Sequence, residues 1–161
     1  MNLPVRKSPR LKGYDYSSCG AYSLTICSYR YQHLFGTIER KVHENVFHFS
    51  DVGLIVQGAV EQLTIRFPEF EIVNYQIMPN HVHILVLKID LDSTLGRTVS
   101  DFVCAFKSLT WAEVNKIYPG KQVWKDSFHD HIIRNERDMS IHWDYIDQNV
   151  NRWQNDKYFQ S

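Results

Sequence analysis

Apolar residues recur along the chain with two different periods, and each period predicts a kind of element. In residues 21–29, β-branched and aromatic residues partly alternate with small polar ones, which is typical of a strand. Residues 71–88 contain two apolar runs that meet at Pro79-Asn80, and this pattern predicts two strands joined by a tight turn. Residues 130–134 predict another strand, whereas the weaker pattern of residues 35–49 indicates a hairpin.

Three other segments have apolar residues three and four positions apart, as amphipathic helices do. Ser50 is suited to cap a helix that runs to about residue 67, where Pro68 ends it. The second helix covers about residues 95–115. The third begins between residues 136 and 140 and reaches about residue 153, with a buried stripe made of Trp143, Ile146, Val150 and Trp153.

The order of these elements is strand, helix, strand, strand, helix, strand, followed by one more helix. This βαββαβ order predicts an α+β fold, a ferredoxin-like sandwich with an antiparallel sheet, and a C-terminal helix that can lie across the sheet. A chain of 161 residues suits one domain, 1–161. Residues 1–12, with Pro4 and Pro9, read as an extended arm of that domain rather than a helix.

The amino-acid composition excludes few classes of binding partner. The formal net charge is zero, so an anionic partner has to be held by local basic patches. The aromatic share of 14% is high, and these rings can fill a core or stack on bases. Three cysteines without a Cys-x-x-Cys pair fit buried thiols in a reducing compartment. The apolar runs are too short for a membrane span, so we expect a cytoplasmic protein with no membrane partner.

Basic residues gather in the N-terminal arm, which has no acidic residue to balance them. A short basic tail is commonly a solvated terminus, but an unbalanced one also suits phosphate groups. Lys107 lies at the edge of the apolar stripe of the second helix. The residues that we expect to contact a nucleic-acid backbone are Arg6, Lys7, Arg10, Lys12 and Lys107.

Two histidines begin the second strand of the 71–88 pair. Because side chains in a strand alternate between faces, His81 and His83 project from one face while Val82 points into the core. The pair can hold a metal ion, or it can be two strand histidines that happen to alternate. A second pair, His129 and His131, flanks a polar Asp, and we interpret it as strand-edge structure.

The last predicted helix carries a small polar face beside its packing face. Tyr145 and Asn149 are four residues apart, so they lie one turn apart on the same side of the helix. If this helix crosses the sheet, it brings both side chains toward the histidine pair. Tyr158 is another tyrosine near that end of the chain, but no polar partner follows it four residues later.

Several motifs together resemble one known family. Met78-Pro-Asn-His-Val-His83 and Tyr145-Ile-Asp-Gln-Asn149 are similar to the HUH motif and tyrosine helix of single-tyrosine transposases, in particular the REP-associated tyrosine transposases. The resemblance covers nearly the whole chain. Val150 departs from it, because this branch more often has Pro after the Asn. Further similar segments are residues 6–16, Ala21-Tyr-Ser-Leu-Thr-Ile-Cys27, Phe35-Gly36, Phe106-Lys-Ser108 and His131-Ile-Ile-Arg-Asn-Glu136.

The resemblance implies an enzyme that cuts and joins single-stranded DNA carrying a hairpin. It implies that His81, His83 and Asn149 hold a divalent cation, Mg²⁺ or Mn²⁺, although imidazole ligands would also suit Zn²⁺. It further implies that Tyr145 is the nucleophile and forms a 5′-phosphotyrosine intermediate. A homodimer is a further possibility. In such a dimer, the tyrosine could act in the site of its own subunit or in that of the partner subunit.

Other functions are compatible with parts of the pattern. Histidine-triad nucleotide hydrolases also use alternating strand histidines, but a third His would stand at position 85, where this chain has Leu85. A non-enzymatic ferredoxin-like module could bind nucleic acid through sheet aromatics alone. An inactive transposase retained by its host for another task would keep the same motifs.

Overall fold

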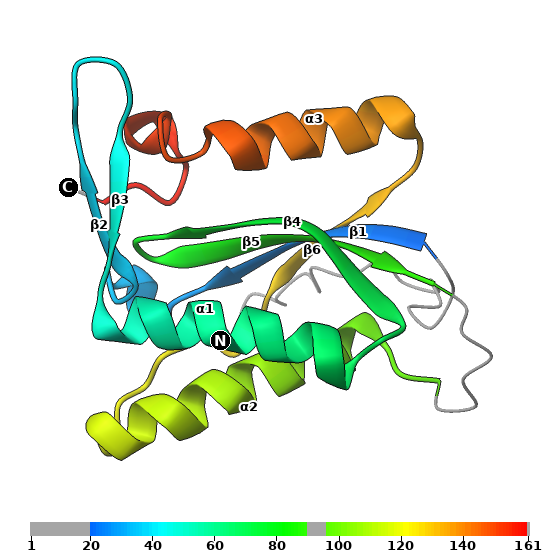
Figure 1. Ribbon diagram of the computed structural model, residues 1–161, viewed down its shortest axis with the longest axis horizontal. Coiled ribbons are helices and arrows are strands. Elements are labelled where there is room, and N and C mark those ends of the chain that lie inside the picture. Colours follow the sequence, from blue (N-terminus) through cyan, green and yellow to red (C-terminus); the bar gives the residue numbers. More distant parts are fainter. Residues whose placement is uncertain (1–19, 90–95, 161) are drawn as a thin grey trace, which may run out of the picture.

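The computed structural model describes residues 20–89 and 96–160 (Figure 1). The predicted arm, with Arg6, Lys7, Arg10 and Lys12, lies outside the described residues. The strands are β1 (Gly20–Cys27), β2 (Gly36–Glu39), β3 (Val46–Phe49), β4 (Phe70–Met78), β5 (His81–Lys88) and β6 (His129–Ile133). The helices are α1 (Asp51–Arg66), α2 (Val99–Ile117) and α3 (Glu136–Gln148), with short 3₁₀ turns at Tyr29–Tyr31 and Trp153–Asn155.

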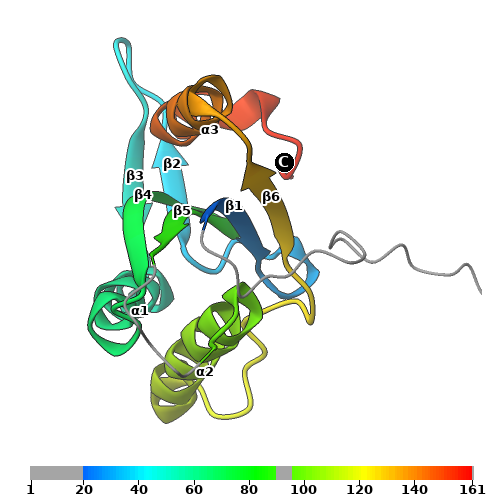
Figure 2. The same cartoon turned by 90° about the vertical axis from the view of Figure 1, so that its right-hand side faces the viewer.

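The main sheet has the strand order β4-β5-β1-β6, with antiparallel neighbours throughout. Helices α1 and α2 cover one face of this sheet, and α3 lies across the other (Figures 1 and 2). This is the predicted ferredoxin-like α+β sandwich with an added C-terminal helix, and the prediction is confirmed. The strand that begins with the two histidines, β5, is one of the two central strands.

Alternation along β5 separates a hydrophobic core face from a second face that carries the two histidines followed by two leucines. Val82, Ile84 and Val86 belong to the core beneath the sheet, where α1 and α2 pack. Successive side chains point to opposite faces, so His81 and His83 stand on the face that α3 covers. The whole strand is shielded from water between its neighbours β4 and β1, which fixes its register and the direction of both imidazoles.

Local signals explain where the first two helices begin. The hydroxyl oxygen of Ser50 accepts a hydrogen bond from the backbone N–H of Gly53 at 3.0 Å, as predicted for the cap of α1. Gly53 is needed there, because a Cβ at this position would lie 1.9 Å from the backbone oxygen of Phe35. Thr98 and Asp101 form a capping box at the start of α2.

The predicted course of α3 is partly wrong. The helix ends at Gln148 rather than near Trp153, and Trp153 is buried in a separate 3₁₀ turn. Trp143, expected in a buried stripe, is 38% exposed, and Ile146 is the buried residue of the helix. The physical reason is that α3 rests on a sheet face that mixes polar and apolar side chains, so it does not need the wide apolar stripe that α1 and α2 use.

The predicted hairpin forms a second, two-stranded sheet from β2 and β3. It stands beside the C-terminal end of α3 (Figure 1). Asn45, in the loop between the two strands, donates from its side chain to the carbonyl oxygen of Val150 at 3.0 Å, and its backbone N–H donates to Asn151 Oδ1 at 2.8 Å. These bonds hold the chain where it leaves α3. None of the helices in the described part of the chain could span a membrane.

Candidate functional site

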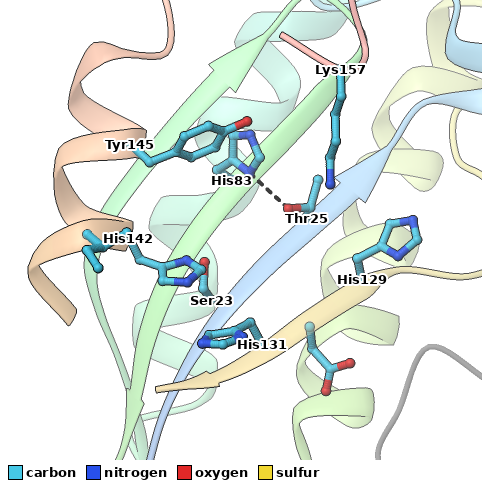
Figure 3. Close-up of a pocket in the computed structure, with 10 residues that line it drawn as sticks. Ser23, Thr25, His83, His129, His131, His142, Tyr145 and Lys157 are labelled. Atoms are coloured by element: carbon cyan, nitrogen blue, oxygen red, sulfur yellow. Dashed lines mark hydrogen bonds between the residues drawn. The ribbon is translucent and has the colours of Figure 1, made fainter. Parts of the chain in front are cut away.

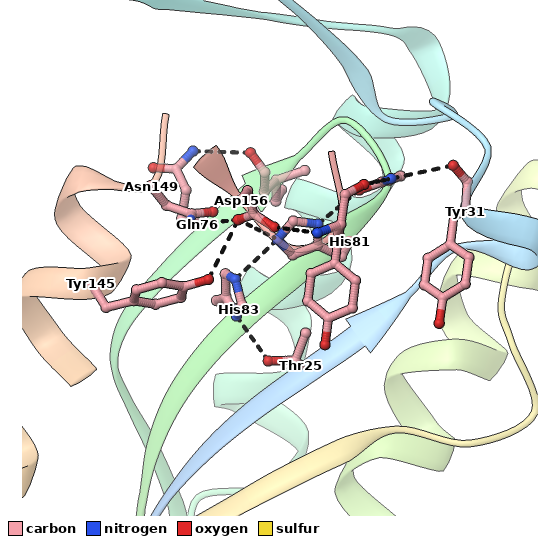
Figure 4. A network of polar contacts seen from close by, with 11 residues as sticks. Thr25, Tyr31, Gln76, His81, His83, Tyr145, Asn149 and Asp156 are labelled. Carbon is pink, nitrogen blue, oxygen red and sulfur yellow. Dashed lines mark hydrogen bonds and ion pairs between the residues drawn. The ribbon is translucent and has the colours of Figure 1, made fainter. Parts of the chain in front are cut away.

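The histidine pair is buried at the start of β5, on the sheet face beneath α3 (Figure 4). The Nε2 atoms of His81 and His83 face one another at 3.0 Å. Asn80 Nδ2 donates to backbone oxygens of Tyr31 and Tyr158, which leaves Asn80 Oδ1 to accept from His81 Nδ1 at 2.8 Å. His81 is therefore neutral with its proton on Nδ1, and its Nε2 presents a lone pair.

The second imidazole has a partner that can adapt. His83 Nδ1 lies 2.9 Å from the hydroxyl oxygen of Thr25, on the neighbouring strand β1. A hydroxyl can donate to this nitrogen or accept from it. Thr25 therefore allows the proton of His83 to sit on Nε2, where it bridges to His81, or on Nδ1, which frees Nε2 for a ligand. Such outer partners orient the histidines of metal sites.

Burial keeps both imidazoles uncharged. Desolvation lowers the pKa of His81 to about 3. Desolvation is also the main cause that holds the pKa of His83 well below its usual range, and the neighbouring His81 adds to it. A neutral imidazole is the form that binds a metal ion, so the pair is ready to act as ligands at neutral pH.

Helix α3 brings both predicted residues to this pair. The ring of Tyr145 lies 5.2 Å from the ring of His83, nearly edge-on. Asn149, at the C-terminal end of α3, is buried, and its Oδ1 atom has no hydrogen-bond partner among residues 20–89 and 96–160. Desolvation and the charge of Asp156 raise the pKa of Tyr145, so its hydroxyl is protonated at neutral pH.

Asp156 completes the centre, and the sequence pattern did not reveal it. Its side chain is fully buried, and Oδ2 lies 3.7 Å from His81 Nε2. The same oxygen accepts hydrogen bonds from Asn149 Nδ2 at 2.9 Å and from the Tyr145 hydroxyl at 3.4 Å (Figure 4). It follows α3 by several residues in an irregular segment, where no spacing rule links it to the histidines.

The residues present fit a divalent cation. One nitrogen from His81, one from His83 and one oxygen from Asp156 all lie within 4.8 Å of one another. The unpartnered Oδ1 of Asn149 supplies a further oxygen donor at the same place. Two nitrogens with a carboxylate and an amide oxygen suit Mn²⁺ or Zn²⁺, and the oxygen donors also suit Mg²⁺.

Next to the centre is a cavity of about 460 Å³, which is open to solvent (Figure 3). Its walls come from β1, β5, β6, α3 and the segment after α3. Lys157 is exposed and lines the same cavity as Tyr145, so the cavity wall includes a cation. The residues that line the cavity are Ser23, Thr25, His83, His129, Asp130, His131, Ile141, His142, Tyr145 and Lys157.

The structure does not bring Lys107 to this centre. Its Nζ atom donates to the backbone oxygens of Lys125 at 2.6 Å and Ser127 at 3.2 Å. It belongs to α2, which covers the opposite face of the sheet from α3. The amine thus holds the segment after α2, and Lys157 is a basic residue that lines the cavity next to Tyr145's helix.

Two other residues from the sequence analysis have further contacts. His131 lies on β6, the edge strand of the sheet, as expected; its Nε2 atom lies 2.8 Å from Asp138 Oδ2 and its ring stacks on that of His142. Tyr158 is buried. Its ring lies 4.7 Å from the ring of His81, so the segment after α3 covers the histidine pair.

Comparison with known proteins assigns the chain to a family. The model of the IS200-like transposase family matches residues 15–149, which include both histidines, Tyr145 and Asn149. The chain belongs to the IS200-like transposase family. This assignment confirms the family resemblance that the sequence motifs predicted.

Relatives of this IS200-like transposase include two proteins of Haemophilus influenzae. One, an uncharacterised protein, is 30% identical over an alignment of 174 residues. This alignment covers 96% of this chain and 93% of that protein. The other, named "Putative REP-associated tyrosine transposase", is 26% identical over 96 residues, which cover 56% of this chain and 54% of that protein. The solved structure of a REP-associated tyrosine transposase bound to a REP hairpin has the same fold, with a TM-score of 0.64 at 20% identity. The match covers 93% of this chain and 75% of that one.

Proposed function

We propose that this transposase is a cation-dependent, single-tyrosine enzyme that cuts and rejoins single-stranded DNA. One observation carries the proposal: Tyr145, the only tyrosine of α3, lies against the same buried group of His81, His83 and Asp156 that could hold a cation. The sequence resemblance assigned the tyrosine and the histidines to such an enzyme, and the fold places them together from separate elements.

The cation site comprises His81, His83, Asp156 and Asn149. A divalent cation held there would supply Lewis-acid polarisation of a phosphate oxygen. Asn80 and Thr25 hold the two imidazoles in orientation from their far sides. The Asp156 carboxylate is a candidate ligand of the cation. Its charge is also one cause of the raised pKa of Tyr145.

Tyr145 is the proposed nucleophile. Its hydroxyl oxygen forms a bond to phosphorus while the bond from phosphorus to the 3′ oxygen breaks, which leaves a 5′-phosphotyrosine and a free 3′-OH. Attack on that phosphotyrosine by another 3′-OH restores the tyrosine and joins a new strand. Lys157, in the wall of the same cavity, is placed to contact the DNA backbone.

We further propose hairpin-containing single-stranded DNA as the substrate. The solved relative was captured on a REP hairpin, and this chain shares its fold over 93% of its length. The tyrosine and the histidines meet within one copy of the chain, so we infer that the reaction proceeds in cis. A homodimer is not required to complete the site.

The decisive experiment is a covalent adduct assay. The protein is incubated with Mn²⁺ or Mg²⁺ and a panel of labelled single-stranded hairpin DNAs, and the products are separated on a denaturing gel. We expect an adduct with the wild type and none with Tyr145→Phe. Tyr75→Phe is the matched control, since Tyr75 packs against the core on the other face of the sheet. An adduct that survives Tyr145→Phe would overturn the assignment, and hairpin binding without any adduct would favour a binding module.

A further inference from the structure

A second group of ligand-type side chains lies at the same cavity, which two of its three residues line. His131 comes from β6, whereas Asp138 and His142 come from the first turns of α3. One atom from each of the three lies within 4.8 Å of the others. The group shares no residue with the His81, His83 and Asp156 centre, and no motif that identified the family includes Asp138 or His142.

The two imidazoles are arranged around one carboxylate. Asp138 Oδ2 lies 2.8 Å from His131 Nε2, and Asp138 Oδ1 lies 3.6 Å from His142 Nε2. The two rings are nearly parallel, with centroids 4.4 Å apart. Both Nε2 atoms therefore face the same carboxylate, one at each oxygen. The distance of 3.6 Å is too long for a hydrogen bond, so His142 and Asp138 do not bond each other directly.

Some of the hydrogen bonds around Asp138 stabilise the start of α3. Asp138 Oδ2 also accepts from the backbone N–H of Arg134 at 3.1 Å, and the Asn135 side chain caps α3 by accepting from the N–H of Asp138. These bonds fix the carboxylate, but they do not account for His142. Within the described part of the chain, His142 Nε2 has only the longer contact to Asp138, so the nitrogen is placed to act as a ligand.

We propose that His131, Asp138 and His142 form a second metal site, selective for Zn²⁺ or a similar transition-metal ion. Two imidazole nitrogens and one carboxylate oxygen are a typical Zn²⁺ donor set, and three protein ligands leave one position open. All three side chains are accessible to solvent to some degree, so an ion can enter.

The position of this site links it to the helix that carries Tyr145. His142 precedes Tyr145 by one helical turn, about 4.5 Å along the axis, and both line the cavity. A bound ion would join β6 to the start of α3 and fix the helix that carries the tyrosine. Its open position would face the cavity, where water or an oxygen of an anionic ligand could occupy it. Metal binding at this second site does not require the proposed DNA chemistry.

Zinc stoichiometry tests the proposal. The full-length protein, stripped of metal, is equilibrated with Zn²⁺ by dialysis, and bound metal is measured by atomic absorption. We expect His142→Ala and Asp138→Asn each to bind one equivalent fewer than the wild type. His129→Ala is the matched control, because His129 lines the same cavity from the same strand but lies outside the group. His142 is partly exposed, so its truncation should leave the fold intact, and circular dichroism checks this.

Two results would overturn the proposal. One is an equal number of bound Zn²⁺ ions in wild type and His142→Ala. The other is a loss of the same equivalent in His129→Ala, which would indicate loose binding by surface histidines. To separate this site from the buried centre, His83→Ala should lose at most the other equivalent and keep the one that His142→Ala loses. Anomalous diffraction at the zinc edge should show a peak among His131, Asp138 and His142.

Discussion

The buried His81 should make the metal-free protein sensitive to mild acid. In the folded chain its pKa lies at about 3, against an ordinary value of 6.5, because burial disfavours the charged ring. The unfolded chain takes up a proton on this residue as the pH falls through 6.5, whereas the folded chain does not until about pH 3. The unfolded state thus binds more protons in this window, and the free energy of unfolding falls as the pH falls.

The size of the effect follows from these two values. Between pH 7 and pH 5, His81 alone should lower the free energy of unfolding by about 2 kcal/mol, since one pKa unit corresponds to about 1.4 kcal/mol. His83, whose pKa is also lowered, acts in the same direction. Such a loss is large compared with the roughly 5–15 kcal/mol that stabilises a typical domain.

Urea unfolding with EDTA present, followed by tryptophan fluorescence at pH 7 and pH 5, measures this loss. His81→Gln should reduce the difference between the two pH values by about 2 kcal/mol, whatever its effect on absolute stability. His43→Gln changes a histidine that is exposed in the folded protein and should leave the difference as in wild type. If His81→Gln keeps the full wild-type difference, the burial argument for a neutral ligand is wrong.

Other predictions concern the cation, the subunit arrangement and the packing of α1. Asp156→Asn should weaken Mn²⁺ binding, measured by electron paramagnetic resonance, by about tenfold or more, and unchanged affinity would remove this residue from the site. A mixture of Tyr145→Phe and His81→Ala should form no DNA adduct if the reaction proceeds in cis, whereas restored activity would show exchange between subunits. Gly53→Ala should lower the free energy of unfolding by about 1–3 kcal/mol, because the added Cβ would meet a backbone oxygen at 1.9 Å. Gly58→Ala, in the same helix with nothing within 4 Å, should instead raise it by about 0.5–1 kcal/mol in the same urea titration.

Local patterns were enough to predict most of the fold. The alternation along residues 82–86 reflects a strand with a core face and a second face, and the cap at Ser50 depends on residues within one turn. The order of these elements then limits the topology to a few arrangements, of which the ferredoxin-like sandwich is one. The histidine pair and Tyr145 could be named as candidates because each belongs to a short motif, and their roles remain predictions.

The end of α3 depended on contacts that no local pattern contains. No Gly or Pro stands between Asn149 and Trp153 to stop the helix. The chain turns there while Asn45, from a distant hairpin, bonds the carbonyl oxygen of Val150. Asp156 could not be predicted for the same reason, because its place beside His81 depends on this turn. Lys107 looked like a free cation beside an apolar stripe, but backbone oxygens take up its amine.

The pairing of β1 has a consequence for the order in which the centre is built. This strand, the first one described, lies between β5 and β6, which come much later in the chain. Pairings between such distant segments form late in folding, since a large loop must close first. Thr25 from β1 and Asp156 from beyond α3 complete the surroundings of the histidines, so the assembled centre requires nearly every described element. A nascent or partly unfolded chain carries the tyrosine and the histidines without their arrangement, so the proposed centre is assembled only when these distant segments have paired.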